Sequence, residues 1–407
     1  MSEAIEGDAA LRVDATASGY RWIILAVVWV GYLVSFVDRL IWTNVSGSAA
    51  NAFGLSFAAV GSFVSAFYAG YVVSTALTGL ASDQFGARLT LSFALTFLGI
   101  FTFAFGFVTT PISGLILQGL MGLSAGADFS AGVKQIFGWF DARNRGRAMG
   151  LFMTATSLGV AIPNLMIPHL LNYISWRTLY EMAGVLTAVL GVVSYLLIRD
   201  NPRNGLFQRA SWSDLRAALT TPQYIWVALA GMGGVWGTWG FAIWASALMT
   251  QGLQFPAATA GSIVATFGIV AIGGKPAIGL LSDWLGGKRK ILVMVDLLLF
   301  GAVLLLTGAA TSEIQLWCLA PILGLTAFVY SPLQNAMAAE AGGRAAGMAA
   351  GLSIALGSIA TSVVPLAVGI GFEATRRFEV AFAILAIGPL LGALCRIPTR
   401  DLVHQRD

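Results

Sequence analysis

Long apolar runs, separated by short polar segments, dominate this sequence and limit what it can fold into. Each run is close to the roughly 20 residues that an α-helix needs to cross the apolar core of a bilayer. Most of the connections between the runs are only a few residues long. The twelve runs cover residues 22–45, 57–81, 89–109, 111–137, 147–171, 178–198, 223–250, 258–282, 291–309, 314–338, 346–370 and 378–396.

The composition supports a membrane protein rather than a soluble one. Apolar residues make up 57% of the 407 residues and charged residues only 10%, against about a quarter charged in soluble domains. One soluble core could not bury that much apolar surface, so lipid must surround most of the chain. We therefore expect an all-α membrane protein with twelve transmembrane helices.

The longest polar connection divides the twelve helices into two sets of six. The expected domains are a cytoplasmic tail at 1–21, a six-helix bundle at 22–198, a cytoplasmic central loop at 199–222, a second six-helix bundle at 223–396 and a cytoplasmic tail at 397–407. Residues 1–19 lack the basic start of a cleavable signal peptide, so we expect the first helix to be retained.

The positive charges predict the orientation in the membrane. With both termini inside, 17 of the 23 lysines and arginines fall in cytoplasmic segments and three, Arg177, Arg376 and Arg377, fall outside. Cytoplasmic segments of membrane proteins carry this excess of positive charge. We therefore expect a multi-pass protein of the cytoplasmic (inner) cell membrane, with both termini in the cytoplasm.

The turn after the second run reappears after the eighth run, 200 residues later. Each copy has a glycine, then Ser-Asp, then a glycine and a cation, which indicates a duplicated six-helix unit. Glycine suits the tight turn, and Asp83 is placed to accept hydrogen bonds at a neighbouring helix N-terminus. We expect both loops to act in conformational gating. Their residues are Gly79, Asp83, Gly86 and Arg88 in the first copy and Gly279, Asp283, Gly286 and Lys288 in the second.

These paired loops, the twelve helices and the central loop resemble the major facilitator superfamily over essentially the whole chain. The resemblance implies two pseudo-symmetric six-helix halves and transport of a solute by rocking of the halves. The sequence departs from the loop of that family at Gln84 and Ala87, where basic residues are usual. The substrate stays open, because one fold serves many functions.

The first helix is similar to that of the anion:cation symporters of the superfamily, which carry Gly-Tyr and then Asp-Arg, as at Asp38-Arg39 here. The arginine and the glutamate that are usual in the fourth helix of that branch are absent, and Asp128 is the acid that can replace the glutamate. A charge at bilayer depth is costly and therefore a functional candidate. Arg39 offers a planar fork suited to a carboxylate or phosphate, and Asp38 or Asp128 is the expected proton carrier.

Each of these charges also has a structural interpretation. Asp38 and Arg39 can lie at the outer rim and reach water, and Lys134 can reach the inner surface. Lys275 lies eight residues before Asp283. Monocarboxylate and oxalate-type carriers of the superfamily have a similar pattern, in which the cation contacts the carboxylate substrate. The resemblance implies that Lys275 binds substrate, with Asp296 as the competing structural partner.

Further candidate substrate-binding residues lie in the seventh and tenth helices. Trp236 and Trp239 are three residues apart and can wall a cavity, although an interfacial belt is the alternative. Tyr330 and Gln334 share one helix face, with Asn335 beside them. Hydrogen bonds between helices explain these three residues equally well.

We expect a secondary active transporter that takes up a small organic anion, a carboxylate, coupled to protons by alternating access. No nucleotide-binding motif occurs, so ion gradients must supply the energy. The alternatives are an anion exchanger, a drug or metabolite efflux antiporter or, in another class, a membrane-embedded sensor or enzyme. No catalytic cluster recurs, so we expect no enzyme. The expected partners are the anion, a proton and the bilayer, without nucleic acid, metal or cofactor, and the expected state is a monomer.

Overall fold

The computed structural model describes residues 2–140, 142–200, 216–217, 219–342 and 346–401. The described residues form helices joined by short turns, as the apolar runs predict. The first half of the chain contains α1 (Ser2–Phe53), α2 (Phe57–Phe85), α3 (Ala87–Phe105), α4 (Pro111–Ala125), α5 (Ala127–Trp139), α6 (Ala142–Leu170) and α7 (Trp176–Leu197). The second half contains α9 (Pro222–Gly252), α10 (Ala257–Trp284), α11 (Arg289–Gly308), α12 (Glu313–Ala327), α13 (Ser331–Ala341), α14 (Ala346–Thr375) and α15 (Phe378–Cys395).

Two of the expected helices are broken at equivalent places. The run at 111–137 forms α4 and α5, which meet at Gly126, and the run at 314–338 forms α12 and α13, which are separated by residues 328–330. Counting each broken pair as one crossing, eleven helical segments of the described chain are long and apolar enough to span a membrane. The 31-residue helix α9 completes the twelve expected segments. The chain is therefore a polytopic α-helical membrane protein.

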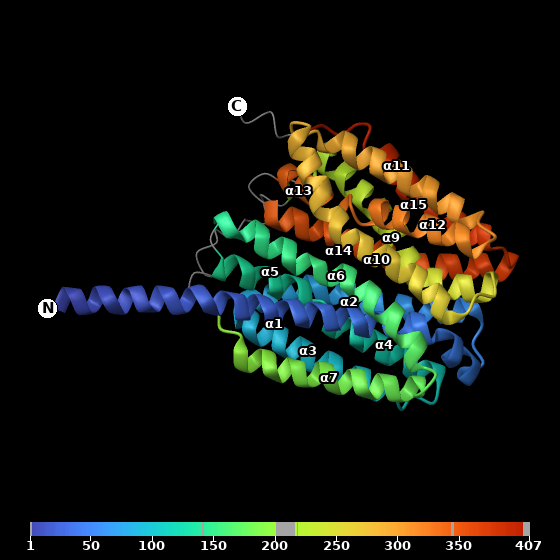
Figure 1. Cartoon of the computed structure of the whole chain (residues 1–407), viewed down its shortest axis with the longest axis horizontal. Helices are drawn as coiled ribbons and strands as arrows, with labels where there is room; N and C mark the ends of the chain where they lie inside the picture. Colours follow the sequence, from blue (N-terminus) through green and yellow to red (C-terminus); the bar gives the residue numbers. More distant parts are fainter. Residues whose placement is uncertain (1, 141, 201–215, 218, 343–345, 402–407) are drawn as a thin grey trace.

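The first helix is longer than the apolar run predicts. We expected a helix over residues 22–45, whereas α1 runs from Ser2 to Phe53 and its first part projects beyond the other helices (Figure 1). An apolar run predicts only the part of a helix that lipid or protein covers. The helix itself can extend beyond that run, until its backbone conformation changes. Here that change occurs at Gly54, which has a φ of +64°.

The helices run roughly along the long axis of the molecule in two groups (Figure 1). The group α1–α7 packs beside the group α9–α15, and we refer to these groups as the first and second halves. Helix α2 packs along α14, and α6 packs along α10. Helix α1 also touches α9, so these three contacts join the halves.

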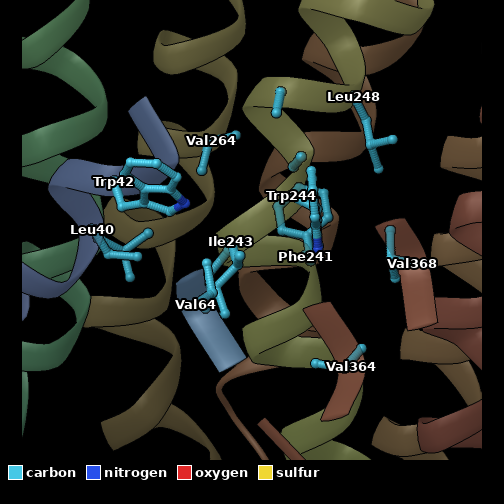
Figure 2. Close-up of a cluster of buried hydrophobic side chains, with 14 of the residues drawn as sticks. Leu40, Trp42, Val64, Phe241, Ile243, Trp244, Leu248, Val264, Val364 and Val368 are labelled. Atoms are coloured by element: carbon cyan, nitrogen blue, oxygen red, sulfur yellow. The ribbon is translucent and has the colours of Figure 1, made fainter. Parts of the chain in front are cut away.

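The two ends of the bundle differ in how the halves meet. At the end where α1 enters the bundle, the Tyr20 hydroxyl donates to the Leu197 carbonyl, and the Gln223 side chain bonds the backbone of Arg400. We call this the terminal end and the opposite one the far end. At the far end one buried apolar cluster includes Trp42 and Val64 of the first half and Trp244 of the second (Figure 2).

The apolar packing toward the terminal end is divided between the halves. One cluster contains buried residues of the first half, such as Tyr32 and Leu91, and two others contain buried residues of the second half, such as Leu297 and Tyr224. The described part of the chain thus has a shared apolar seal at the far end and separate cores at the terminal end.

Glycines of α2, α10 and α14 also differ between the far end and the terminal end. A Cβ added to Gly61 of α2 would lie 2.7 Å from the Pro365 carbonyl oxygen, and one added to Gly268 of α10 would lie 2.8 Å from that of Ser157. Toward the terminal end, a Cβ at Gly279 of α10 or Gly351 of α14 would meet nothing within 4 Å. At Gly61 and Gly268, toward the far end, the helices of the two halves thus approach closely.

The internal repeat extends to equivalent hydrogen bonds. Gly86 and Gly286 both have positive φ, +85° and +69°, which glycine adopts without strain. The Asp200 carboxylate, after α7, accepts from the Arg88 amide at 3.1 Å. In the second half the Asp401 carboxylate, after α15, accepts from the Lys290 amide at 2.8 Å.

Asp200 and Asp401 are the acids that cap these helices in the described residues. We expected a contact with a helix N-terminus from Asp83, whose side chain lies outside the described part, so that expectation stays a prediction. Its second-half equivalent, Asp283, is exposed. Chain order does not reveal this arrangement, because Asp200 is more than 100 residues from the helix that it caps.

Candidate functional site

A cavity of about 140 Å³ lies between the two halves, and we call it the central cavity. A larger cavity, about 430 Å³, is lined by α2, α3 and α4 side chains and has no charged residue in its wall, so it does not bring the candidate charges together. The first half lines the central cavity with Tyr32, Phe36, Arg39, Tyr68, Tyr71, Phe129, Met153 and Thr156. The second half lines it with Gly231, Val235, Thr238, Trp239, Lys275, Phe328, Tyr330, Ser331, Gln334, Asn335, Ser353, Ile354, Ser358 and Thr361.

An ion pair between α1 and α5 forms part of the first-half wall. The guanidinium of Arg39 donates to the Asp128 carboxylate at 2.5 Å, and the Ser35 hydroxyl donates to the same oxygen at 2.7 Å. The guanidinium carbon lies 4.2 Å from the centre of the Phe36 ring and 4.5 Å from that of Tyr71. Arg39 is only 8% exposed, so it does not reach water at an outer rim, and its charge is compensated within the protein.

Asp38 points away from the cavity although it precedes Arg39 in sequence. Successive side chains of a helix project about 100° apart, so neighbours face different surroundings. One oxygen of Asp38 accepts from the Thr187 hydroxyl of α7 at 2.7 Å, and the other has no hydrogen-bond partner among the described residues. Asp38 is 1% exposed. It is therefore a buried carboxyl group inside the first half, and the outer-rim interpretation is wrong for it as well.

Lys275 reaches from the second half to the first. Its ammonium donates to the hydroxyls of Thr156 at 2.8 Å and Ser157 at 2.9 Å, both on α6. It also lies 4.8 Å from the centre of the Phe328 ring. An ammonium has three donors, and these bonds use two of them.

No acid pairs with Lys275 among the described residues. The ion pairs that those residues form are Arg39–Asp128, Arg289–Glu340 and Arg377–Glu379. Asp296, which we considered as a competing partner, is buried in α11, and one of its oxygens has no hydrogen-bond partner within the described chain. The positive charge of Lys275 thus faces the cavity with hydroxyl partners alone.

The aromatic and polar candidates of the second half divide into two groups. Trp239, Tyr330, Gln334 and Asn335 line the cavity. Trp236 does not line it, since its indole donates to the Ile384 carbonyl of α15 at 2.9 Å. Two residues three apart share a broad helix face, but here the helix presents one side of that face to α15 and the other to the cavity.

The candidate loop residues lie at the terminal end, remote from the cavity. The Arg88 side chain donates to the Tyr195 carbonyl at 2.8 Å, and the Lys134 ammonium donates to the Ser82 carbonyl at 2.5 Å. Lys134 therefore bonds the C-terminal end of α2. The carboxylate of Asp200, which caps α3, also accepts from Gln135 of α5 at 2.8 Å.

Several lining residues escaped the sequence analysis. Tyr32 and Phe36 lie seven and three positions before Arg39, and that spacing places all three on one face of α1, so their position could have been predicted. Thr156 and Ser157 carried no such signal. A hydroxyl in an apolar helix usually bonds its own backbone, and only the packing of α6 on α10 brings these two to Lys275.

Twelve membrane crossings in two halves, with charged side chains meeting in a cavity between them, define a solute transporter of the membrane. The family model of the Major Facilitator Superfamily matches residues 28–365. The chain belongs to this superfamily, as the paired loops implied.

Full-length relatives agree with that assignment, and a solved structure shares the fold. The chain is 22% identical to the "Probable L-galactonate transporter" of Escherichia coli (strain K12), covering 95% of this chain and 89% of that protein. It is 23% identical to the "Probable galactarate/D-glucarate transporter" of the same organism, covering 92% and 93%. A bacterial homologue of the human lysosomal transporter Spinster has the same fold, with a TM-score of 0.72 at 14% identity, covering 93% of this chain and 95% of that one.

Proposed function

We propose that this transporter moves a small organic anion, a carboxylate, across the cytoplasmic membrane by proton-coupled uptake. The observation that carries the proposal is Lys275, a cation in the wall of the central cavity that is bonded by hydroxyls of the opposite half and has no acid partner among the described residues. A buried cation without a counter-ion is costly at membrane depth. A carboxylate supplies the missing charge and accepts the third hydrogen bond of the ammonium.

Similarity supports the same class of substrate. Two relatives that cover almost the whole chain are named as transporters of sugar acids. Their names describe those proteins, and at this level of identity the exact substrate need not be shared. The substrates in those names are organic acids, and the positive charge of this cavity also favours an organic acid.

Asp38 is the better candidate for the proton site. Asp128 already serves as the counter-ion of Arg39, whereas Asp38 forms no ion pair among the described residues, so a proton on Asp38 breaks no ion pair. Asp38 has a hydroxyl partner on one oxygen and none on the other within the described residues. We therefore assign proton coupling to Asp38 and the fixing of Arg39 to Asp128.

Alternating access fits the packing of the two halves. The far end is closed by a shared apolar cluster, and the halves have separate cores toward the terminal end. If the termini are cytoplasmic, as the excess of positive charge there indicates, the structure is inward-facing. The bundles 22–198 and 223–396 then rock as units, and the loops at Gly86 and Gly286 act as gates at the terminal end.

Binding by purified Lys275 variants tests the anion site. We expect wild-type protein to bind small carboxylates, Lys275→Arg to bind them with altered affinity, and Lys275→Ala to lose binding by about tenfold or more, since a charged hydrogen bond contributes about 1.5–3 kcal/mol. Isothermal titration calorimetry with carboxylates and their neutral amides measures this. Trp236→Phe is the matched control, because Trp236 packs on α15 outside the cavity. Normal carboxylate binding by Lys275→Ala, or a preference for the amides, contradicts the proposal.

A further inference from the structure

We propose that the preferred substrate is a monocarboxylate with a flat aromatic body, rather than a polyhydroxylated or dicarboxylic acid. This inference rests on the organic-anion transport proposed above and narrows it to one chemical class. It follows from three features of the cavity, namely its charge, its rings and the engagement of its hydroxyl groups.

The charge of the cavity matches one carboxylate. Arg39 and Asp128 neutralise each other at 2.5 Å. Asp38 lies outside the wall, so Lys275 is the uncompensated charge among the described lining residues. A monoanion neutralises that charge, whereas a second carboxylate on the same substrate would meet no further cation and would have to lose its hydration without compensation.

Aromatic rings surround the position next to Lys275. The Phe36 and Trp239 rings stack across the two halves with centroids 5.3 Å apart, and Trp239 meets Phe328 edge-on at 5.8 Å. Phe328 is the ring that lies beside the Lys275 ammonium, at 4.8 Å. A carboxylate at Lys275 thus has its body against Phe328 and Trp239, and offset stacking or edge-to-face contact favours a flat ring there.

Five polar side chains of the second-half wall already donate a hydrogen bond within the protein. Thr238 donates to the Ala327 carbonyl, Ser331 to Phe328, Ser358 to Ile354 and Thr361 to Gly357. The Gln334 amide donates to the Val227 carbonyl at 2.8 Å. A sugar acid needs a hydrogen-bond partner for each hydroxyl, because a buried polar group without one is unfavourable. The four engaged hydroxyls can accept from a sugar acid but cannot donate to it, whereas the Tyr68 hydroxyl has no hydrogen-bond partner among the described residues.

Isothermal titration calorimetry of the full-length protein in detergent tests the inference with a matched set of probes. The set contains benzoate, its neutral amide benzamide, the dicarboxylate terephthalate and the polyhydroxylated monocarboxylate gluconate. We expect benzoate to bind at least tenfold more tightly than each of the other three. If gluconate or terephthalate binds as tightly as benzoate, the aromatic monoanion is wrong while organic-anion transport stands. If benzamide binds as well as benzoate, or if no carboxylate binds, both are wrong.

Asp128→Asn tests the charge argument by itself. The substitution removes the counter-ion of Arg39 and gives the cavity a second uncompensated cation, so we expect the preference for benzoate over terephthalate to fall at least tenfold. An unchanged ratio overturns the charge argument. Phe328→Leu tests the ring, and we expect it to weaken benzoate at least fivefold while leaving gluconate unchanged; equal weakening of both overturns the aromatic assignment. Monodisperse elution in gel filtration identifies the folded variants, and the wild-type panel decides the proposal if Asp128→Asn does not fold.

Discussion

The role of each buried charge in this protein depends on whether another residue compensates it. Asp38 and Arg39 are adjacent in sequence, yet one faces Thr187 inside the first half and the other faces Asp128 and the cavity. Arg39 therefore needs Asp128 to remain buried, and Asp128 needs Arg39. Among the described residues that line the cavity, the uncompensated cation is Lys275, and this difference in pairing separates a charge that is fixed within the protein from one that is free to meet an anion.

The ion pair gives a prediction about stability at the level of single residues. Arg39→Ala leaves Asp128 buried without a counter-ion, and breaking a buried pair in this way costs about 3–5 kcal/mol. We expect Arg39→Ala and Asp128→Ala each to lower the melting temperature in detergent, and the double variant Arg39→Ala/Asp128→Ala to lower it less than the sum of the two. Differential scanning fluorimetry measures all three. A strictly additive double variant would show that the two charges do not depend on each other.

At the level of elements, close helix contacts occur where glycine removes the side chain. Helix α2 approaches α14 at Gly61, and α10 approaches α6 at Gly268. The breaks in the two fourth helices, at Gly126 and at residues 328–330, lie beside the cavity and occur at equivalent positions of the repeat. Phe129 and Phe328, which lie near these breaks, line the cavity, and discontinuous helices beside a central cavity also occur in other transporters.

The contact between α2 and α14 depends on the absence of a side chain at Gly61. A valine there places a Cβ 2.7 Å from the Pro365 carbonyl, so α2 and α14 must separate. In a background with Cys318→Ser and Cys395→Ser, we expect Gly61→Val to weaken the far-end seal and to increase labelling of a cysteine introduced at Val64 by a membrane-impermeant maleimide. Gly351→Val is the control, because a Cβ at that position meets nothing within 4 Å. Equal labelling of the two variants would mean that the glycine contact does not hold the seal.

At the scale of the whole molecule, a disulfide across the far end tests whether that end opens during transport. The Ala58 amide of α2 donates to the Glu373 carboxylate of α14 at 2.8 Å, which brings the two halves together. In a background with Cys318→Ser and Cys395→Ser, we expect Ala58→Cys with Glu373→Cys to form a disulfide that stops transport but keeps substrate binding. Reduction should restore transport, and each single cysteine variant should remain active. Full transport by the oxidised protein would exclude opening of the far end from the cycle.

Much of the fold was predictable because lipid makes hydropathy a direct signal of helix position. The twelve runs, the repeat and the family resemblance all agree with the structure, since each depends on local sequence. Contacts between distant segments were not predictable. The Lys275–Thr156 bond depends on how α6 packs against α10, the choice of Asp200 as the cap depends on α7, and the exclusion of Trp236 from the cavity depends on α15.

Uphill uptake by proteoliposomes tests whether the protein is a proton-coupled carrier of organic anions. The measured quantity is the accumulation of the radiolabelled monocarboxylate that binds best in the panel above, driven by an inside-alkaline pH gradient. Liposomes without protein correct for weak acid that crosses the bilayer unaided. We expect wild-type protein to concentrate the anion above this background, a protonophore to abolish the gain, Asp38→Asn to exchange the anion without concentrating it, and Lys275→Ala to do neither. Accumulation by wild-type protein that equals the protein-free background, or by Asp38→Asn that equals wild type, would contradict proton-coupled uptake through these residues.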